Sequence, residues 1–149
     1  MLRVEPQAAA VSALDSALAR VGDRWSLLIV EALLEGPRRF SDLSGQVAAI
    51  APNILAERLR RLERERVVLS KPYSQRPLRM EYRLSAEGQE LAGVLRLLAD
   101  WSAKGHGAAA SDQGGLRHDP CGTTLEARWY CPTCARSVRD DEGSDLSYA

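Results

Sequence analysis

Apolar residues recur at steps of three and four in the first part of the chain, which is the spacing of a helix with one apolar side. A first helix is predicted over residues 8–21 and ends at Gly22. Asp23 can cap a second helix, whose residues 25–34 are apolar on nearly every side, and Gly36 and Pro37 stop it. A helix that is apolar all round belongs in the centre of a small domain.

Two further helices are predicted between residues 41 and 66. Ser41 can cap a short one that runs to about residue 47, and Pro52 suits the first turn of a longer one that runs to about residue 66. On the longer helix one stripe is apolar and the opposite stripe is polar. The apolar stripe holds Leu55, Leu59 and Leu62, and the polar stripe holds Asn53, Glu57, Arg60 and Arg64.

A hairpin and a last helix complete this part of the chain. Residues 67–69 and 80–84 have the composition of strands, and residues 71–79 between them form a basic loop interrupted by prolines. Ser85 can cap a final helix through about residue 104. Its apolar face is too wide for one small domain to cover, so a partner is expected.

Composition divides the rest of the chain. We expect a main domain over residues 8–104, a linker over 105–117, a small cysteine-containing module over 118–137 and an acidic, disordered tail over 138–149. The longest apolar run, at residues 27–34, is far too short to cross a bilayer, and the chain does not open with a secretory leader. A cytoplasmic protein without membrane association is therefore expected.

The formal net charge of zero hides an uneven distribution of charge. Residues 38–79 hold ten Lys and Arg against four Asp and Glu, a net +6 that the rest of the chain offsets. Such a zone is typical of nucleic-acid binding, although a solvated helix surface can have the same composition.

The order of the predicted elements indicates a mainly α fold with a small β-hairpin wing, the winged helix-turn-helix. The helix at about 52–66 would enter the major groove of double-stranded DNA, and the wing at about 70–80 would follow the backbone. Asn53 could read adenine, Arg60 guanine and Ala56 a thymine methyl group.

The remaining DNA-binding candidates are assigned to phosphates, where they would fix the register of binding. They are Arg38, Arg39, Arg58, Arg61, Arg64, Lys71, Arg76 and Arg79, and Ser41 is a further DNA-binding candidate. The alternative is that several of these arginines only solubilise the surface or pair with Glu57, Glu63 and Glu65.

Residues 20–104 resemble the HxlR family of bacterial winged-helix regulators. The matching stretches are VGDRWSLLIVEALLEGPRRFSDL, PNILAERLRRLE and RPLRMEYRLSAEG. The resemblance implies homodimers assembled through the first and last helices, which bind imperfect palindromes and mostly repress neighbouring genes. The corresponding interface candidates are Val11, Leu14, Leu18, Leu91, Leu95, Leu98 and Trp101.

Two departures from the family pattern bear on mechanism. Many members sense oxidants with a cysteine before the first helix, but this chain has no cysteine before Cys121, so that mechanism does not carry over. Ala51 stands where the family usually has Ser or Thr as a helix cap, a loss of about 1 kcal/mol.

The module at 118–137 contains His118, Cys121, Cys131 and Cys134, in the pattern H-x2-C followed by C-x2-C. Each pair can bind a metal from one tight turn, and two such turns supply four tetrahedral ligands. We expect a zinc-ribbon-like module with one Zn²⁺ per chain. The alternatives are reduced cysteines in a disordered tail, or a zinc–thiolate switch that responds to oxidation.

Together these features predict a sequence-specific, homodimeric transcriptional regulator, a repressor that binds a palindromic operator. A small-molecule effector could bind between the long helices and the DNA-binding helices. The alternative is a winged-helix and zinc-ribbon subunit that docks onto the transcription machinery. An enzyme is not expected, because His106 and His118 are the only histidines and no nucleophile has an evident base.

Overall fold

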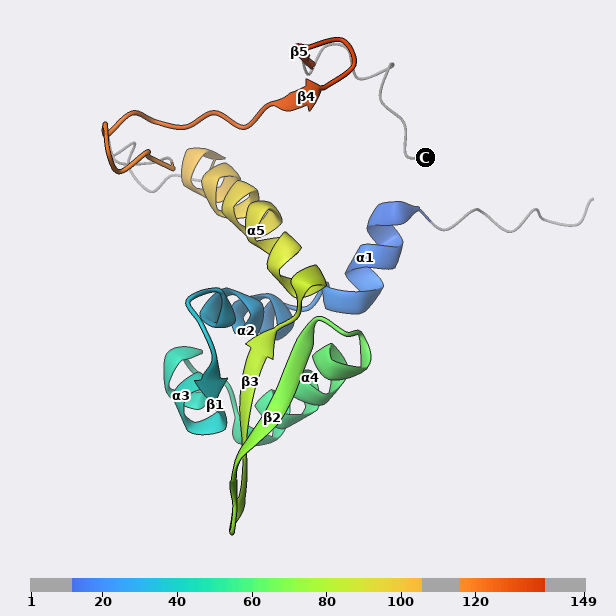
Figure 1. The fold of residues 1–149 in the computed structure, drawn as a ribbon, viewed down its shortest axis with the longest axis vertical. Coiled ribbons are helices and arrows are strands. Elements are labelled where there is room, and N and C mark those ends of the chain that lie inside the picture. The colour runs from blue at the N-terminus through green and yellow to red at the C-terminus, as the bar shows by residue number, and fades with distance from the viewer. Residues whose placement is uncertain (1–11, 106–115, 139–149) are drawn as a thin grey trace, which may run out of the picture. The chain divides into compact units, whose positions relative to one another are not determined.

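The computed structural model describes residues 12–105 and 116–138, which form helices and short strands (Figure 1). By their contacts these residues fall into two units, and the boundary between Leu91 and Ala92 lies inside the last long helix. The elements in chain order are α1 (Ala13–Val21), α2 (Arg24–Leu34), β1 (Arg38–Arg39), α3 (Phe40–Gln46), α4 (Pro52–Arg64), β2 (Val68–Gln75), β3 (Leu78–Leu84), α5 (Ala86–Gly105), β4 (Trp129–Cys131) and β5 (Arg136–Val138).

The starts of α1 and α2 follow from local capping. The Ser12 hydroxyl accepts a hydrogen bond from the backbone N–H of Asp15 at 3.0 Å, so α1 begins at Ala13. The Asp23 carboxylate accepts from the N–H groups of Trp25 and Ser26 at 3.1 and 3.0 Å, which confirms the predicted cap of α2. Ser12 is extended, with φ −68° and ψ 154°, so the predicted helix over residues 8–21 is wrong at this position. Residues 8–11 of that prediction lie outside the described residues.

The core of the first unit lies where α2, α3, α4 and the base of the hairpin meet. Leu55, Leu59 and Leu62 are buried, which confirms the predicted apolar stripe of α4. They pack in a core that also includes Ile29, Val30, Leu33, Leu43, Val47, Ile50, Val67, Val68 and Leu84. Full burial of one such side chain stabilises the fold by about 2 kcal/mol, so this core holds α4 in place.

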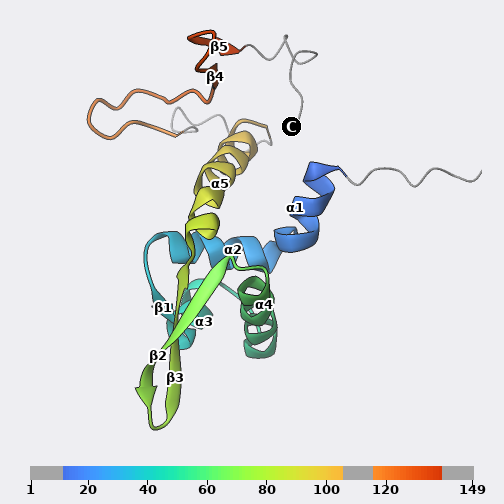
Figure 2. The same ribbon diagram turned by 45° about the vertical axis from the view of Figure 1, so that its right-hand side comes forward.

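The strands β1, β3 and β2 form an antiparallel sheet in that order. The prediction of a loop over residues 71–79 is wrong, because β2 and β3 remain paired from Val68↔Leu84 out to Gln75↔Leu78, with one irregularity between Pro72 and Ser74. Pro72 is tolerated because β2 is an edge strand, where a missing backbone N–H has less effect. The hairpin is therefore a long, paired wing that extends beyond α3 and α4 (Figure 2).

Two predicted helix bounds also need correction. The short helix begins at Phe40 rather than after a cap at Ser41, because the Asp42 carboxylate accepts the backbone N–H of Arg39 at 3.1 Å. The fourth helix ends at Arg64 rather than at about residue 66, because Arg66 has a φ of 58° and cannot continue a right-handed helix.

The α4–β2 connection is locked to the start of α5. The Ser85 hydroxyl accepts the N–H of Gly88 at 3.0 Å, which confirms its role as a cap, and it donates to the carbonyl oxygen of Arg66 at 2.6 Å. A Cβ atom at Gly88 would lie 2.2 Å from the carbonyl oxygen of Val67, so only glycine allows this approach.

The second unit contains α5 from Ala92 onward and residues 116–138. Its strands β4 and β5 pair antiparallel, from Trp129↔Val138 to Cys131↔Arg136, and Arg117 forms an isolated bridge with Thr124. None of residues 116–138 is buried. The expected linker core at 106–115 and the acidic tail from residue 139 lie outside the described residues. No helix in the described ranges is both long and apolar enough to cross a membrane.

Candidate nucleic-acid interface

The outward side of α4 carries the predicted polar stripe. Asn53, Glu57, Arg60 and Arg64 are all exposed, as the helical period predicts. Ala56, the third base-reading candidate, is half-buried. At the start of the helix, Ala51 makes no side-chain capping bond, as expected, and Pro52 occupies the first turn. Both views show α3, α4 and the hairpin extending from the same side of α2 (Figures 1 and 2).

Arg58 and Arg61 point back toward the start of α2. Arg58 Nε lies 3.0 Å from Asp23 Oδ1, and Arg61 Nη1 lies 3.8 Å from Asp23 Oδ2. Arg61 also donates to the carbonyl oxygen of Ala19, and Arg58 forms a second ion pair with Glu57 at 3.0 Å. Both arginines thus connect α4 to the α1–α2 junction.

The Asp23 carboxylate is held in its charged form by these neighbours. Partial burial alone would raise its pKa, but hydrogen bonds from the Ser26 hydroxyl and N–H, together with the charges of Arg58 and Arg61, lower the pKa below its ordinary value. Asp23 therefore acts both as a helix cap and as an anion that orients two arginines of α4.

Residues of α3 and the wing border a hollow of about 500 Å³. Arg39 is exposed and stacks over the Tyr73 ring at 4.4 Å, while Ser41 and Arg79 line the same hollow. A guanidinium held on an aromatic ring remains available to an anion on its outer side. This corner is the place where the structure brings α3 and wing candidates together.

The other basic candidates differ in their contacts. Arg76 is exposed where β2 meets β3. Lys71 pairs with Glu81 at 3.2 Å, and half-buried Arg38 pairs with Glu35 at 2.6 Å. The sequence pattern did not indicate Glu35 and Glu81, the carboxylates that pair with Arg38 and Lys71.

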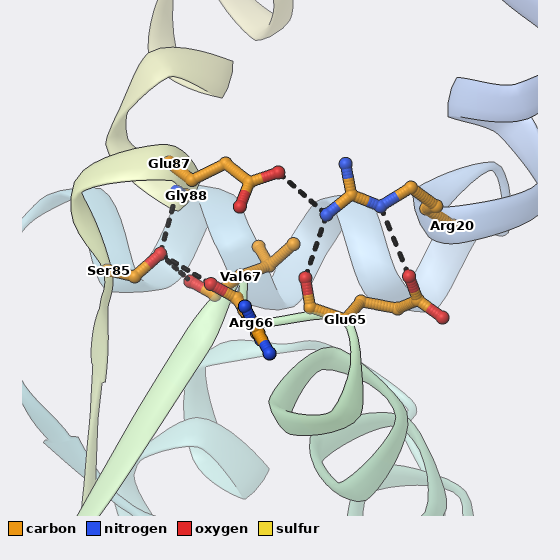
Figure 3. Close-up of polar contacts among 7 residues, drawn as sticks. All are labelled: Arg20, Glu65, Arg66, Val67, Ser85, Glu87 and Gly88. Atoms are coloured by element: carbon orange, nitrogen blue, oxygen red, sulfur yellow. Dashed lines mark hydrogen bonds and ion pairs between the residues drawn. The ribbon is translucent and has the colours of Figure 1, made fainter.

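A polar cluster that the sequence pattern missed joins α1, the end of α4 and the start of α5 (Figure 3). Arg20 Nε lies 3.1 Å from Glu65 Oε2, and its Nη2 donates to the Glu65 carbonyl oxygen at 2.8 Å and to Glu87 Oε1 at 2.7 Å. The partners are 45 and 67 residues away in the chain, so no local pattern could indicate them. Through this cluster α1 is tied to the C-terminal end of α4.

Apolar side chains are exposed on both helices of the expected dimer interface. In α1, Leu14 is 63% and Leu18 52% exposed, and in α5, Leu98 is 48% and Trp101 62% exposed. Leu91 and Leu95 are half-buried, and Val11 lies outside the described residues.

The four expected metal ligands form two pairs. His118 Nδ1 lies 3.2 Å from Cys121 Sγ, and Cys131 is hydrogen-bonded to Cys134. That bond lowers the pKa of Cys131 and raises that of Cys134. Among residues 12–105 and 116–138, no three His, Cys, Asp or Glu side chains meet in one group that could hold a metal ion. The structure shows two pairs and not a closed four-ligand site.

The sequence of this chain is similar to those of known transcriptional regulators. Residues 20–109 match the profile of the HxlR-like helix-turn-helix family. An uncharacterised HTH-type transcriptional regulator of Mycobacterium tuberculosis is 34% identical over 122 residues, which is 82% of this chain and 77% of the relative. The HTH-type transcriptional regulator YodB of Bacillus subtilis is 32% identical over 89 residues, 60% of this chain and 80% of YodB.

Among solved structures, a transcription factor of Pseudomonas aeruginosa superposes with a TM-score of 0.66 at 33% identity, covering 85% of this chain and 86% of that chain. That coverage exceeds residues 1–109, so the similarity reaches into the C-terminal part of the chain. Because the family profile matches residues 20–109, more than half of this chain, the chain belongs to the HxlR-like helix-turn-helix family.

Proposed function

We propose that the chain is a sequence-specific DNA-binding transcriptional regulator that acts as a homodimeric repressor on a palindromic operator. The observation that carries this proposal is α4, which is anchored by a buried leucine stripe and presents Asn53, Arg60 and Arg64 outward. A helix of this kind beside a basic hairpin fits the major groove, with the hairpin along the backbone. The membership of the HxlR-like family supports the same function.

The exposure and contacts of each side chain suggest which residues read bases and which bind phosphates. Asn53 and Arg60 are exposed on α4 and have the donor and acceptor geometry to read adenine and guanine, with Ala56 close to the bases as a small apolar contact. Phosphate contacts are assigned to basic residues that are exposed: Arg39, Arg64, Arg76 and Arg79.

The remaining basic residues have carboxylate partners within the protein. For Arg58 and Arg61, the ion pairs with Asp23 support a role in positioning α4. We assign them this role first and phosphate binding second. For Lys71 the exposed ion pair with Glu81 contributes at most about 1 kcal/mol, so a phosphate could replace it as partner. Arg38 is assigned in the same way, as a residue that can exchange Glu35 for phosphate.

The test begins with selection of binding sites from random-sequence duplex DNA by the full-length protein. An inverted repeat is the expected product, since two copies of α4 in a symmetric dimer read two equivalent half-sites. Absence of any enriched sequence would contradict sequence-specific binding.

A matched pair of variants then separates base reading from phosphate binding. Arg60→Ala should relax discrimination at one base position of each half-site by about 1 to 3 kcal/mol, whereas Arg79→Ala should weaken binding to all sequences alike and reduce the salt slope by about 2, one for each subunit. The measurement is affinity for a panel of operator variants at two salt concentrations. An unchanged ranking of operators by Arg60→Ala would show that Arg60 does not read a base.

Salt dependence also separates this proposal from a docking subunit of the transcription machinery. A dimer that neutralises about six phosphates should lose several orders of magnitude in DNA affinity when salt rises about fourfold. A docking interface held by apolar contacts would change much less, because screening acts on charges and not on buried apolar area.

A further inference from the structure

Residues 116–124 form a tight hairpin turn that carries one pair of metal-ligand side chains. Arg117 bridges Thr124, and the backbone N–H of His118 donates to the carbonyl oxygen of Thr123 at 2.9 Å. Within the turn, the N–H of Cys121 donates to the His118 carbonyl oxygen at 3.1 Å. The turn thus places His118 and Cys121 next to each other on a reversal of the chain.

The β4–β5 hairpin carries the other pair in the same register. Tyr130 pairs with Ser137, and Cys131 pairs with Arg136. Cys134 follows Cys131 at the same spacing as Cys121 follows His118. In both hairpins the first ligand candidate stands directly before the four residues of the turn, since His118 donates its N–H to the carbonyl oxygen of Thr123 and Cys131 pairs with Arg136; the second candidate lies three residues after the first.

The backbone confirms that the two turns are alike. Gly122 directly follows Cys121 and has a φ of 69°, and Ala135 directly follows Cys134 and has a φ of 50°. Alanine reaches this left-handed conformation only under constraint, at a cost of about 1 to 2 kcal/mol. The same conformation at the same position shows one turn design used twice, at positions 118–122 and 131–135.

The spacing of the side chains suits one metal ion. With tetrahedral Zn–N and Zn–S bonds of about 2.0 and 2.3 Å, two ligands of zinc lie about 3.5 Å apart. His118 Nδ1 and Cys121 Sγ lie 3.2 Å apart, and Cys131 is already hydrogen-bonded to Cys134. Each turn is therefore a preformed two-ligand half-site.

The apolar side chains of residues 116–138 are too few and too exposed to hold the two hairpins together, so another stabilising interaction is needed. None of residues 116–138 is buried, and large side chains such as Trp129 and Tyr130 are 66% and 61% exposed. A segment this short cannot stabilise two hairpins with a hydrophobic core, and small domains of this size depend on disulfides or metal ions. Three cysteines can make at most one disulfide, and a disulfide within the Cys131 and Cys134 pair would leave the two turns unconnected.

We propose that His118, Cys121, Cys131 and Cys134 bind one Zn²⁺ per chain, a property beyond the DNA-binding role. Three thiols lose their protons to solvent, and the thiolates and neutral imidazole complete a tetrahedral site; such soft ligands exclude Mg²⁺ and Ca²⁺. The half-sites do not share one group among the described residues, so metal binding brings them together. The nine residues between Cys121 and Cys131 can reach about 30 Å, which permits this closure.

The first test is the metal content of the purified full-length protein, measured by elemental analysis after exhaustive dialysis. We expect about one zinc per chain in the wild type. In Cys121→Ser and in Cys131→Ser the zinc content should fall about tenfold or more. The control is His106→Ala, which removes the only other histidine and should keep the metal. A wild-type protein without zinc, or a Cys131→Ser variant that retains one equivalent, would overturn the proposal.

A second measurement distinguishes the site from other arrangements of the same residues. Cobalt loaded in place of zinc should give the strong visible absorption of a tetrahedral ion with thiolate ligands, and His118→Ala should change that spectrum. Half an equivalent of metal per chain would mean a site shared between two chains, and a Cys131–Cys134 disulfide found by mass spectrometry would mean a redox pair. Either result overturns one closed site per chain.

Discussion

A single carboxylate, that of Asp23, links the start of α2 to α4. It accepts backbone hydrogen bonds at the first turn of α2 and lies 3.0 Å from Arg58 Nε and 3.8 Å from Arg61 Nη1. These contacts hold its pKa below the ordinary value against the opposing effect of burial. The cap was predictable because its bonds reach only two and three residues along the chain, whereas the ion pairs join distant positions.

At this residue we expect Asp23→Asn to lower the free energy of unfolding by about 1 to 2 kcal/mol near neutral pH, because the amide can still cap α2 but cannot pair with the arginines. The pKa of Asp23 is lowered in the folded state, so its stabilising effect is fully present above the pKa of the unfolded chain, about 4. The effect is lost as pH falls through the lower folded-state pKa. Urea unfolding at several pH values measures the difference between wild type and variant.

The control is Glu90→Gln, which removes an exposed carboxylate from α5 without touching α4. Its stability should follow that of the wild type over the whole pH range. A difference between wild type and Asp23→Asn that does not narrow below about pH 4 would show that the charge of Asp23 contributes nothing. All measurements use one protein concentration, because the stability of the proposed dimer depends on concentration.

Among elements, α4 starts without the side-chain cap that α1 has. Ala51 and Ser12 stand at the same position of their helices with similar backbones, φ −71° and ψ 142° against φ −68° and ψ 154°. A serine at position 51 can therefore bond an N–H of the first turn without strain. We expect Ala51→Ser to raise the free energy of unfolding by about 1 kcal/mol.

The matched variant at the other helix is Ser12→Ala, which removes the bond to the Asp15 N–H and should destabilise by a similar amount, about 1 kcal/mol. Urea midpoints of both variants measure the effect. Equal stability of wild type and Ala51→Ser would mean that water or a neighbouring group already satisfies the first turn of α4.

The elements also show which parts of the fold can be predicted from sequence. The apolar stripe of α4 was predicted correctly because Leu55, Leu59 and Leu62 obey a local period. The length of the wing was not predicted correctly, because a proline such as Pro72 argues against a strand unless that strand is known to lie at the edge of the sheet. The strand β1 has only two residues and exists because Arg38 and Arg39 pair with β3, a contact that no local pattern contains.

The same division holds for the candidate site. The exposure of Asn53, Arg60 and Arg64 follows from helical periodicity and was predictable. The ion pairs of Arg58 and Arg61 with Asp23, and the Arg20 cluster with Glu65 and Glu87, join distant segments and required the fold.

For the whole molecule, α1 and α5 each expose large apolar side chains. Leu14 and Leu18 on α1 are both more than half exposed, and α1 is joined to the end of α4 through Arg20 and Glu65. If α1 packs against a second copy, the dimer interface and α4 are connected through this cluster. The distance between two copies of α4 on DNA would then depend on how α1 is packed.

We expect Leu14→Glu to weaken dimerisation by at least about 100-fold, because burying an unpaired carboxylate in an apolar interface costs several kcal/mol. The matched control is Leu78→Glu, which places the same charge on an equally exposed leucine of the wing, 65% against 63%. Analytical ultracentrifugation should show a shift toward monomer for Leu14→Glu and an unchanged dimer for Leu78→Glu. Loss of operator binding together with the dimer would show that α4 acts in pairs. A Leu14→Glu protein that stays dimeric at the wild-type dissociation constant would place the interface away from α1.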